Sequence, residues 1–253
     1  MFFFYIYFTI KEYVLIGDFM KFEKYQANGN DFIVLDENYT HKSLLAKKLC
    51  SRKESVGADG LIFFNKYQNR IFFFNQDGSE ANLCVNGLRC LGLYLYRHNI
   101  LKKRRKINFG NTFYYLEVYQ DNPFLIKVIF NKKDYSFQTK TFKHKKIYLI
   151  DIGNKHLVCD KSLESKLSSL VEICPNYNIN FVKIISQDKI SVKTFERGVG
   201  FTLNCGSGSL ASCFVYHKLN IINEKVNVDD KLEIDLSTCT LLGKANFVFQ
   251  GEI

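Results

Sequence analysis

The chain contains two stretches that resemble each other, and this internal repeat limits its fold more than any other feature. Gly29-Asn30 and Gly153-Asn154 both open the pattern G-N-x-x-[IL]-V-x-D. Downstream, C-x-x-G occurs as Cys84-Val85-Asn86-Gly87 and as Cys205-Gly206-Ser207-Gly208. The first cysteine lies 54 residues after Asn30 and the second lies 51 residues after Asn154, so order and spacing are both kept. Two similar domains related by a pseudo-two-fold axis explain the repeat most simply.

Both cysteines have the same local surroundings in the sequence. Each follows a strand and a glycine-containing turn, stands ten residues after a phenylalanine (Phe74 or Phe195), and opens an apolar helix. Hydrophobic spacing predicts helices near residues 43–50, 88–96 and 209–219. It predicts strands near 32–35, 61–64, 70–74, 181–185 and 190–195, and mostly strand over 107–150 and 231–253. The pattern indicates an α+β fold with many strands and few helices.

Composition excludes several classes of protein. Of the 253 residues, 47% are hydrophobic and 24% charged, which is typical of a globular protein and excludes a disordered chain. The formal net charge is +10, but the clearest basic run, residues 102–106, contains no aromatic residues and is interpreted as a solvated turn. The Phe, Tyr, Lys and Asn enrichment is consistent with coding bias, so neither a nucleic-acid nor a membrane partner is expected.

The first nineteen residues are set apart from the rest. They are apolar and aromatic as far as Ile10, and Lys11 and Glu12 end the run, which is too short to span a bilayer. A basic start and a small-residue cleavage site are missing, so the segment is a poor export signal. We interpret it as an appended stretch before a natural start at Met20, with a weak membrane anchor as the alternative. A reducing, cytoplasmic location is therefore expected.

Two cysteines at equivalent helix starts predict a specific chemistry. A helix N-terminus presents unpaired N–H groups and the positive end of a dipole, so it binds carboxylates and lowers the pKa of a nearby thiol. If Cys84 and Cys205 face one cleft, one can take a proton from a carbon atom while the other returns a proton to its opposite face. The result is inversion without a cofactor or a metal. The other cysteines, Cys90 and Cys213 among them, are interpreted as buried apolar residues.

Together the motifs resemble the diaminopimelate epimerase family. The matching segments follow the family's order and are residues 20–22, 29–32, 57–61, 74–80, 84–90, 153–156, 178–182, 196–200 and 205–208. The resemblance implies two similar domains, each a barrel-like wrap of strands around a central helix, with the site between them. The implied division is an extension at 1–19, an N-terminal half at 20–120 that includes the last strand near 246–253, and a C-terminal half at 121–245.

The resemblance also implies roles for particular residues. Cys84 and Cys205 match the acid/base pair, the first as donor and the second as acceptor. His156 and Glu196 match residues that tune the thiols, and Glu196 also contacts the substrate. The substrate-binding positions match the side chains or backbone N–H groups of Asn30, Asn75, Val85, Asn86, Asn154, Asn178, Arg197, Gly206 and Ser207. The implied activity is the conversion of LL-2,6-diaminopimelate to the meso form in lysine and peptidoglycan precursor biosynthesis.

Other interpretations stay open. The chain could act on another amino acid such as proline or hydroxyproline, use one cysteine in peroxide or redox chemistry, or be a degenerate, non-catalytic or RNA-binding member. Three departures from the family pattern, Val85, Lys155 and Phe201, predict lower activity or an altered substrate preference. The expected partner is a small amino-acid substrate, and a homodimer is one option for the oligomeric state.

Overall fold

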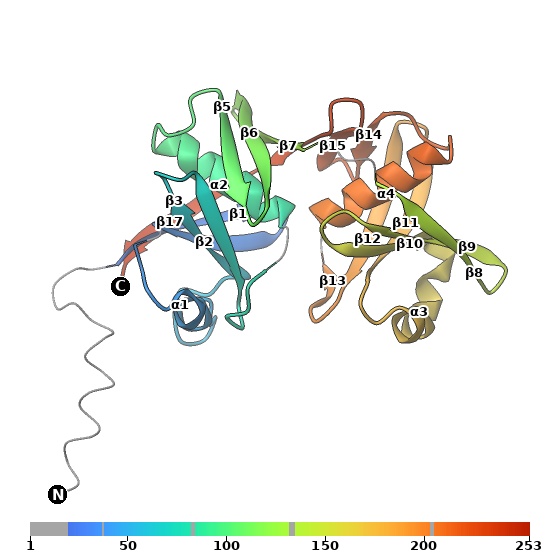
Figure 1. Cartoon of the computed structure of the whole chain (residues 1–253), viewed down its shortest axis with the longest axis horizontal. Helices are drawn as coiled ribbons and strands as arrows, with labels where there is room; N and C mark the ends of the chain where they lie inside the picture. The colour runs from blue at the N-terminus through green and yellow to red at the C-terminus, as the bar shows by residue number, and fades with distance from the viewer. Residues whose placement is uncertain (1–19, 37, 82–83, 132–134, 203–204) are drawn as a thin grey trace, which may run out of the picture.

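The computed structural model describes residues 20–36, 38–81, 84–131, 135–202 and 205–253. Two halves lie side by side, each with one long helix, α2 or α4, among its strands (Figure 1). The segment 1–19 lies outside the described residues, so its interpretation stays a prediction. The α+β expectation is confirmed, since strands far outnumber helices in the described chain.

The elements of the first half follow one another in a fixed pattern. Two strands precede a short helix, two more precede the long helix α2, and a meander follows. They are β1 (Lys21–Ala27), β2 (Asn30–Asp36), α1 (Lys42–Leu49), β3 (Gly60–Asn65), β4 (Arg70–Asn75), α2 (Val85–Arg97), β5 (Arg104–Phe109), β6 (Thr112–Asp121) and β7 (Phe124–Phe130).

The second half repeats this pattern with small additions. A 3-10 turn precedes its short helix, and an extra strand precedes its long helix α4. The elements are β8 (Phe137–Phe142), β9 (Lys145–Asp151), β10 (Lys155–Asp160), η1 (Lys161–Lys166), α3 (Leu167–Ile173), β11 (Asn178–Ser186), β12 (Lys189–Glu196), β13 (Gly200–Thr202), α4 (Gly206–Lys218), β14 (Lys225–Val228), β15 (Leu232–Asp235) and β16 (Thr240–Lys244). The last strand of the chain, β17 (Asn246–Glu252), returns to the first half.

Strand pairing is the same in both halves. In the first half β1 pairs antiparallel with β2, β2 parallel with β3, β3 antiparallel with β4, β4 parallel with β5, and β5, β6 and β7 antiparallel in turn. In the second half β9, β10, β11, β12, β14, β15 and β16 follow the same succession of directions. The predicted pseudo-two-fold repeat is therefore a property of the fold.

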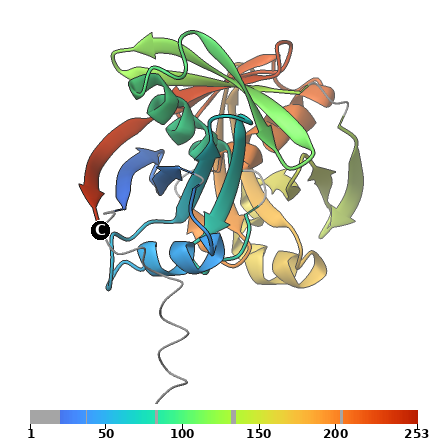
Figure 2. The same ribbon diagram turned by 60° about the vertical axis from the view of Figure 1, so that its left-hand side comes forward.

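Each half is completed by a strand that follows the last meander strand of the other half. β7 and β16, which end the two meanders, pair antiparallel with each other and join the halves. The chain then continues from β16 into β17, which pairs with β1, and from β7 into β8, which pairs with β9. Figure 2 shows β17 running beside β1 on the outside of the first half. The predicted boundary at residue 120 falls within β6, which pairs onward with β7, and the division itself stays a prediction.

The parallel strands at the centre of each half are covered on both faces. In β2, Phe32 and Val34 pack in the main core with α2, whereas Ile33 and Leu35 pack in a second core with residues of α1. In β10, Val158 likewise packs in the main core. Because both faces are buried, these strands form nearly continuous apolar runs. Packing against these strands fixes the positions of α2 and α4, and therefore the positions of the cysteines at the starts of the two helices.

Two sequence interpretations differ from the structure. α3 was not expected, and the basic run was expected to be a turn. Instead Arg104 begins β5, and its guanidinium lies 4.3 Å from the ring centre of Tyr115 on the paired strand β6. The aromatic residues that the run lacks in sequence come from the neighbouring strand. In the described chain, no helix is both long and apolar enough to span a membrane.

Candidate active site

The two cysteines occupy identical positions at the starts of the central helices. Cys84 is the N-cap of α2 with φ −119° and ψ 100°, and Cys205 is the N-cap of α4 with φ −110° and ψ 109°. Each sulfur accepts a hydrogen bond at 3.4 Å from the backbone N–H three residues later, that of Gly87 or Gly208. The sulfur atom thus takes the capping role that a Ser or Asp oxygen usually has.

The glycine of each C-x-x-G motif makes room for a strand. A Cβ atom on Gly87 would lie 2.5 Å from the ring of Phe73 in β4, and one on Gly208 would lie 2.1 Å from Asn180 Oδ1 in β11. Any larger residue would push the start of the helix off the sheet. The motif therefore couples a capping sulfur to close contact between the first helical turn and the sheet.

The two helix starts touch each other. A Cβ atom on Gly206 would lie 2.9 Å from Cβ and 3.2 Å from Cγ1 of Val85, and 3.4 Å from Oδ1 of Asn86. The residues that follow the two cysteines are therefore in van der Waals contact across the boundary between the halves. Val85, an unusual residue for the family motif, packs against the space that Gly206 leaves.

Burial has the largest effect on the pKa of both thiols and raises it, whereas their positions at helix starts predicted a lowered pKa. It raises the pKa of Cys84 to about 12, although the N–H of Gly87 opposes this and Glu196 adds to it. Burial and then Glu196 also raise the pKa of Cys205, against hydrogen bonds from Ser207 and Gly208. A charge on Cys84 raises the pKa of Cys205 further.

Glu196 is a carboxylate whose charge raises the pKa of both thiols. It ends β12, and its carboxylate accepts a hydrogen bond from Thr202 Oγ1 at 2.7 Å. Burial raises the pKa of Glu196, while Thr202 and the thiol of Cys205 lower it. Glu196 thus raises the pKa of both thiols, and the tuning role that the family resemblance implies for it stays a prediction.

His156 supports Cys205 through a chain of hydrogen bonds. Asn180 Nδ2 donates to His156 Nδ1 at 3.1 Å, so the ring proton is assigned to Nε2, which lies 3.1 Å from Ser207 Oγ. The Ser207 hydroxyl is then free to donate to Cys205 Sγ at 3.4 Å. His156 is fully buried, and burial lowers its pKa to about 4, so the imidazole is neutral at pH 7. The chain provides a donor that stabilises a thiolate on Cys205.

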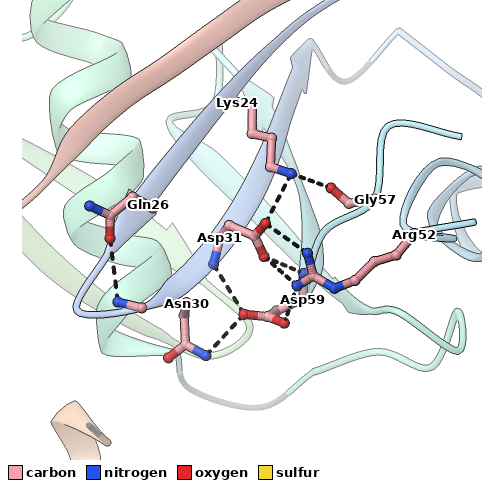
Figure 3. Close-up of polar contacts among 8 residues, drawn as sticks. Lys24, Gln26, Asn30, Asp31, Arg52, Gly57 and Asp59 are labelled. Atoms are coloured by element: carbon pink, nitrogen blue, oxygen red, sulfur yellow. Dashed lines mark hydrogen bonds and ion pairs between the residues drawn. The ribbon is translucent and has the colours of Figure 1, made fainter. Parts of the chain in front are cut away.

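Asn30 is held by a network of charged residues (Figure 3). Its Nδ2 donates to Asp59 Oδ2 at 3.2 Å, and its Oδ1 accepts from Asn86 Nδ2 at 2.5 Å. Arg52 binds Asp59 and Asp31 at 2.7 Å each, as Figure 3 shows. Asn30 therefore connects the start of α2 to a rigid ionic cluster.

The same cluster keeps Asp31 ionised. Burial raises the pKa of Asp31, but hydrogen bonds from Arg52 and Lys24 outweigh it and bring the pKa to about 2. Lys24 also donates to the carbonyl oxygen of Gly57 at 2.5 Å. The charges balance locally, so the cluster can position Asn30 over the whole neutral pH range.

The remaining predicted residues lie at strand ends and in turns. Asn75, at the end of β4, is exposed and donates to Ser79 Oγ at 2.9 Å, and Asn154 is half-buried between β9 and β10. The exposed Arg197 follows β12, and its backbone N–H donates to Asn178 Oδ1 at 3.0 Å. The structure thus brings Arg197 and Asn178 together, outside the cluster around the cysteines.

Three supporting residues were not recognised as part of the site. The sequence predicts no role for Asn180, Asp59 or Arg89. Arg89 donates from Nη2 to Asn86 Oδ1 at 2.8 Å. The sequence alone does not separate Asn180 from Asn178, because residues two apart in a strand point to the same face. Within the described residues, no group of three or more His, Cys, Asp or Glu residues could hold a metal ion.

Comparison with known proteins identifies the class to which this geometry belongs. The diaminopimelate epimerase family model matches residues 22–133. A hydroxyproline epimerase from Agrobacterium vitis has the same fold, with a TM-score of 0.66 at 9% identity over 93% of this chain and 92% of that one. The chain therefore shares the fold of a known amino-acid epimerase.

Full-length relatives specify the family. The diaminopimelate epimerase of Methanocaldococcus jannaschii is 31% identical over 92% of this chain and 98% of that protein. The diaminopimelate epimerase of Archaeoglobus fulgidus is 33% identical over 91% of this chain and 95% of that protein. The chain belongs to the diaminopimelate epimerase family.

Proposed function

We propose that the protein interconverts LL-2,6-diaminopimelate and the meso isomer, with Cys84 and Cys205 as the two acid/base groups. The observation that carries the proposal is the contact between Val85 and Gly206, which brings two cysteine-capped helix starts together. The names of the full-length relatives supply the substrate. We further propose that the reaction serves lysine and peptidoglycan precursor synthesis in the cytoplasm, where thiols stay reduced.

The proposed step exchanges one proton for another at the α-carbon. Cys205, as thiolate, takes the α-proton, and the electron pair of the broken C–H bond delocalises into the substrate carboxylate. Cys84, as thiol, then donates its proton to the opposite face, so one S–H bond forms and another breaks. The reverse reaction exchanges these roles. N–H groups of residues 85–86 and 206–207, at the positive ends of two helices, stabilise the carboxylate as it gains charge.

The raised thiol pKa values fit such a reaction. An α-proton is only weakly acidic, and the strength of a base increases with its pKa. A buried thiolate is therefore a stronger base than an exposed one, although a smaller fraction is ionised. Ser207 and the N–H of Gly208 supply the hydrogen bonds that a thiolate on Cys205 needs.

The exposed residues of the site are assigned to the amino-acid group of the substrate that lies away from the reacting α-carbon. Arg197 can bind a carboxylate with two parallel hydrogen bonds, and Asn178 lies beside it. Asn75 pairs with Gly60 across β3 and β4, next to Asp59, whose charge reaches Glu196. A second charged amino-acid end would find partners here, whereas proline would not use them.

The test is solvent exchange at the α-carbon. We expect purified, reduced protein to incorporate deuterium from D₂O into LL-2,6-diaminopimelate while the meso isomer accumulates. Cys84→Ala and Cys205→Ala should each lower epimerisation by about 10²–10⁴-fold. Cys90→Ala and Cys213→Ala, which change buried cysteines on the same two helices, are the matched controls and should keep activity.

Other outcomes identify the alternatives. Isomerisation of proline or hydroxyproline, with none of diaminopimelate, would replace the substrate but keep the two thiols. Peroxide turnover that needs only one cysteine, without deuterium incorporation, would indicate redox chemistry. Salt-sensitive RNA binding without isomerisation would indicate a degenerate member. Full activity in either cysteine variant would refute the two-thiol mechanism, and homodimerisation stays a separate prediction.

A further inference from the structure

Arg89 is a buried cation with no carboxylate partner among the residues that the structure describes. It lies on α2, its exposed fraction is 0%, and its Nη1 has no hydrogen-bond partner in the described structure. Burying a charge without an opposite charge is costly, and such groups are usually paired. A structural role alone would be filled more favourably by an apolar residue, so the retained charge requires an explanation.

The guanidinium of Arg89 links the two halves beside the thiols. Nη2 donates to Asn86 Oδ1 at 2.8 Å, and Nε donates to the carbonyl oxygen of Lys244 in β16 at 3.3 Å. Gly243 leaves the space for this contact, since a Cβ there would lie 3.1 Å from Nε and 3.3 Å from Cζ. Asn86 donates onward to Asn30. Arg89 thus connects the start of α2 to a strand of the second half.

The second half has no equivalent cation. When α2 and α4 are aligned from their capping cysteines, Leu210 takes the position in α4 that Arg89 takes in α2. Asn86 aligns with Ser207, which is held by the neutral His156 instead. The second residue of each helix is therefore supported in both halves, by a permanent cation in one and by a neutral ring in the other.

We propose that Arg89 is a positioning residue that makes the two thiols unequal, by fixing Asn86 between the halves and keeping a positive charge beside Cys84. The kinetic part of this proposal rests on the proposed epimerase function, whereas the difference between the thiols does not. The charge persists at neutral pH, because burial lowers the pKa of Arg89 only to about 10.

The electrostatics around Cys84 agree with this assignment. Burial raises the pKa of Cys84, and Arg89 opposes the rise that Glu196 of β12 adds. Cys90 on α2 and Cys205 on α4 also face this region, and Asp31 of β2 acts on Cys90. Removing the cation should therefore raise the pKa of Cys84 and leave Cys205 nearly unchanged.

Alkylation measured at each cysteine separately tests the charge. Wild type, Arg89→Met and Arg89→Lys would be treated with iodoacetamide from pH 6 to 10, and Cys84 and Cys205 quantified by peptide mass spectrometry. Arg89→Met should slow alkylation of Cys84 below pH 9 by roughly tenfold, as a one-unit rise in pKa implies, with Cys205 unchanged. Arg89→Lys should keep the wild-type pH dependence. Leu210→Met, at the aligned position of α4, should change neither cysteine.

Kinetics test the positioning. Arg89→Lys keeps the charge but loses the fork that holds Asn86 and Lys244 together, so kcat should fall by roughly tenfold while KM changes little. If Arg89→Met slows the alkylation of both cysteines equally, or of neither, the electrostatic part of the proposal is wrong. Wild-type kcat in Arg89→Lys would overturn the positioning part. Because alkylation needs no substrate, failure of the proposed epimerisation would leave the first test intact.

Discussion

At the scale of the single residue, His156 shows how burial decides a charge. The ring accepts a hydrogen bond from Asn180 and donates one to Ser207, which leaves no acceptor for a second ring proton. Burial lowers its pKa from 6.5 to about 4. The neutral ring can therefore orient Ser207 without bringing a second positive charge to the site.

The lowered pKa of His156 predicts acid sensitivity. Above pH 6.5 the ring is neutral in both the folded and the unfolded chain, and its contribution to stability is complete. As pH falls from 6.5 towards 4 only the unfolded chain binds the proton, so the free energy of unfolding should fall by up to about 3 kcal/mol. Urea unfolding at a series of pH values measures this loss.

Two variants separate His156 from other titrating groups. His156→Gln should be less stable at pH 7 but should show a flatter pH dependence between 6.5 and 4. His144→Asn changes an exposed histidine with φ 64°, a backbone conformation that Asn tolerates, and should keep the wild-type slope. Equal slopes in wild type and His156→Gln would show that this histidine does not titrate as described.

The sequence points to the proposed reacting groups more clearly than to the residues that support them. The thiols could be predicted because a repeated C-x-x-G is visible in the chain. Arg89 and Asn180 act through partners far away in sequence, Lys244 and His156, and nothing local marks them. The predicted lowering of the thiol pKa was wrong because a helix start is a local feature, whereas the burial that outweighs it depends on the whole fold.

At the scale of elements, the contact between the starts of α2 and α4 sets the distance between the thiols. Gly206→Ala should lower stability by about 1–3 kcal/mol, because its Cβ would lie 2.9 Å from Cβ of Val85. Alanine otherwise favours a helix over glycine, so a loss would come from the contact. We also expect kcat to fall, since the cysteines separate with the helices. Thermal unfolding and steady-state kinetics measure the two effects.

A double variant provides the control for this contact. Val85→Gly removes the side chain that the new methyl group would meet, so Val85→Gly/Gly206→Ala should recover most of the stability lost in Gly206→Ala. The coupling between the two changes should exceed about 0.5 kcal/mol, the limit within which independent sites usually add. Additive effects would mean that the two helix starts do not touch in solution.

Elements with strong periodicity were predicted and weaker ones were not. The helices predicted at 88–96 and 209–219 correspond to α2 and α4, which begin three residues earlier, directly after the capping cysteines. The second helix ends at Lys218, one residue before the predicted end. α3 has only seven residues, two of them serine, and follows a 3-10 turn, so it has no clear apolar stripe. In α1 only Ala46 and Leu49 are buried, and Leu44 is 52% exposed, so its apolar side is narrow.

At the scale of the whole molecule, each half depends on a strand that follows the other half's meander. β17 closes the first half against β1, and β8 closes the second half against β9. An equivalent ring contact occurs at each place. Phe247 of β17 packs edge-on against Tyr25 at 5.6 Å, and Phe137 of β8 packs edge-on against Tyr148 at 5.6 Å. Pairing this distant in sequence could be expected only from the family resemblance.

These two ring contacts allow the halves to be destabilised one at a time. Phe247→Ala removes the contact with Tyr25 and the stacking of Arg97 at 3.7 Å, and should cost about 1–3 kcal/mol in the first half. Amide exchange should then accelerate in α2 more than in α4, whereas Phe137→Ala should do the reverse. If each variant accelerated both helices equally, the molecule would open as one cooperative unit through the β7–β16 pairing, and the proposed division into two halves would describe its architecture but not its stability.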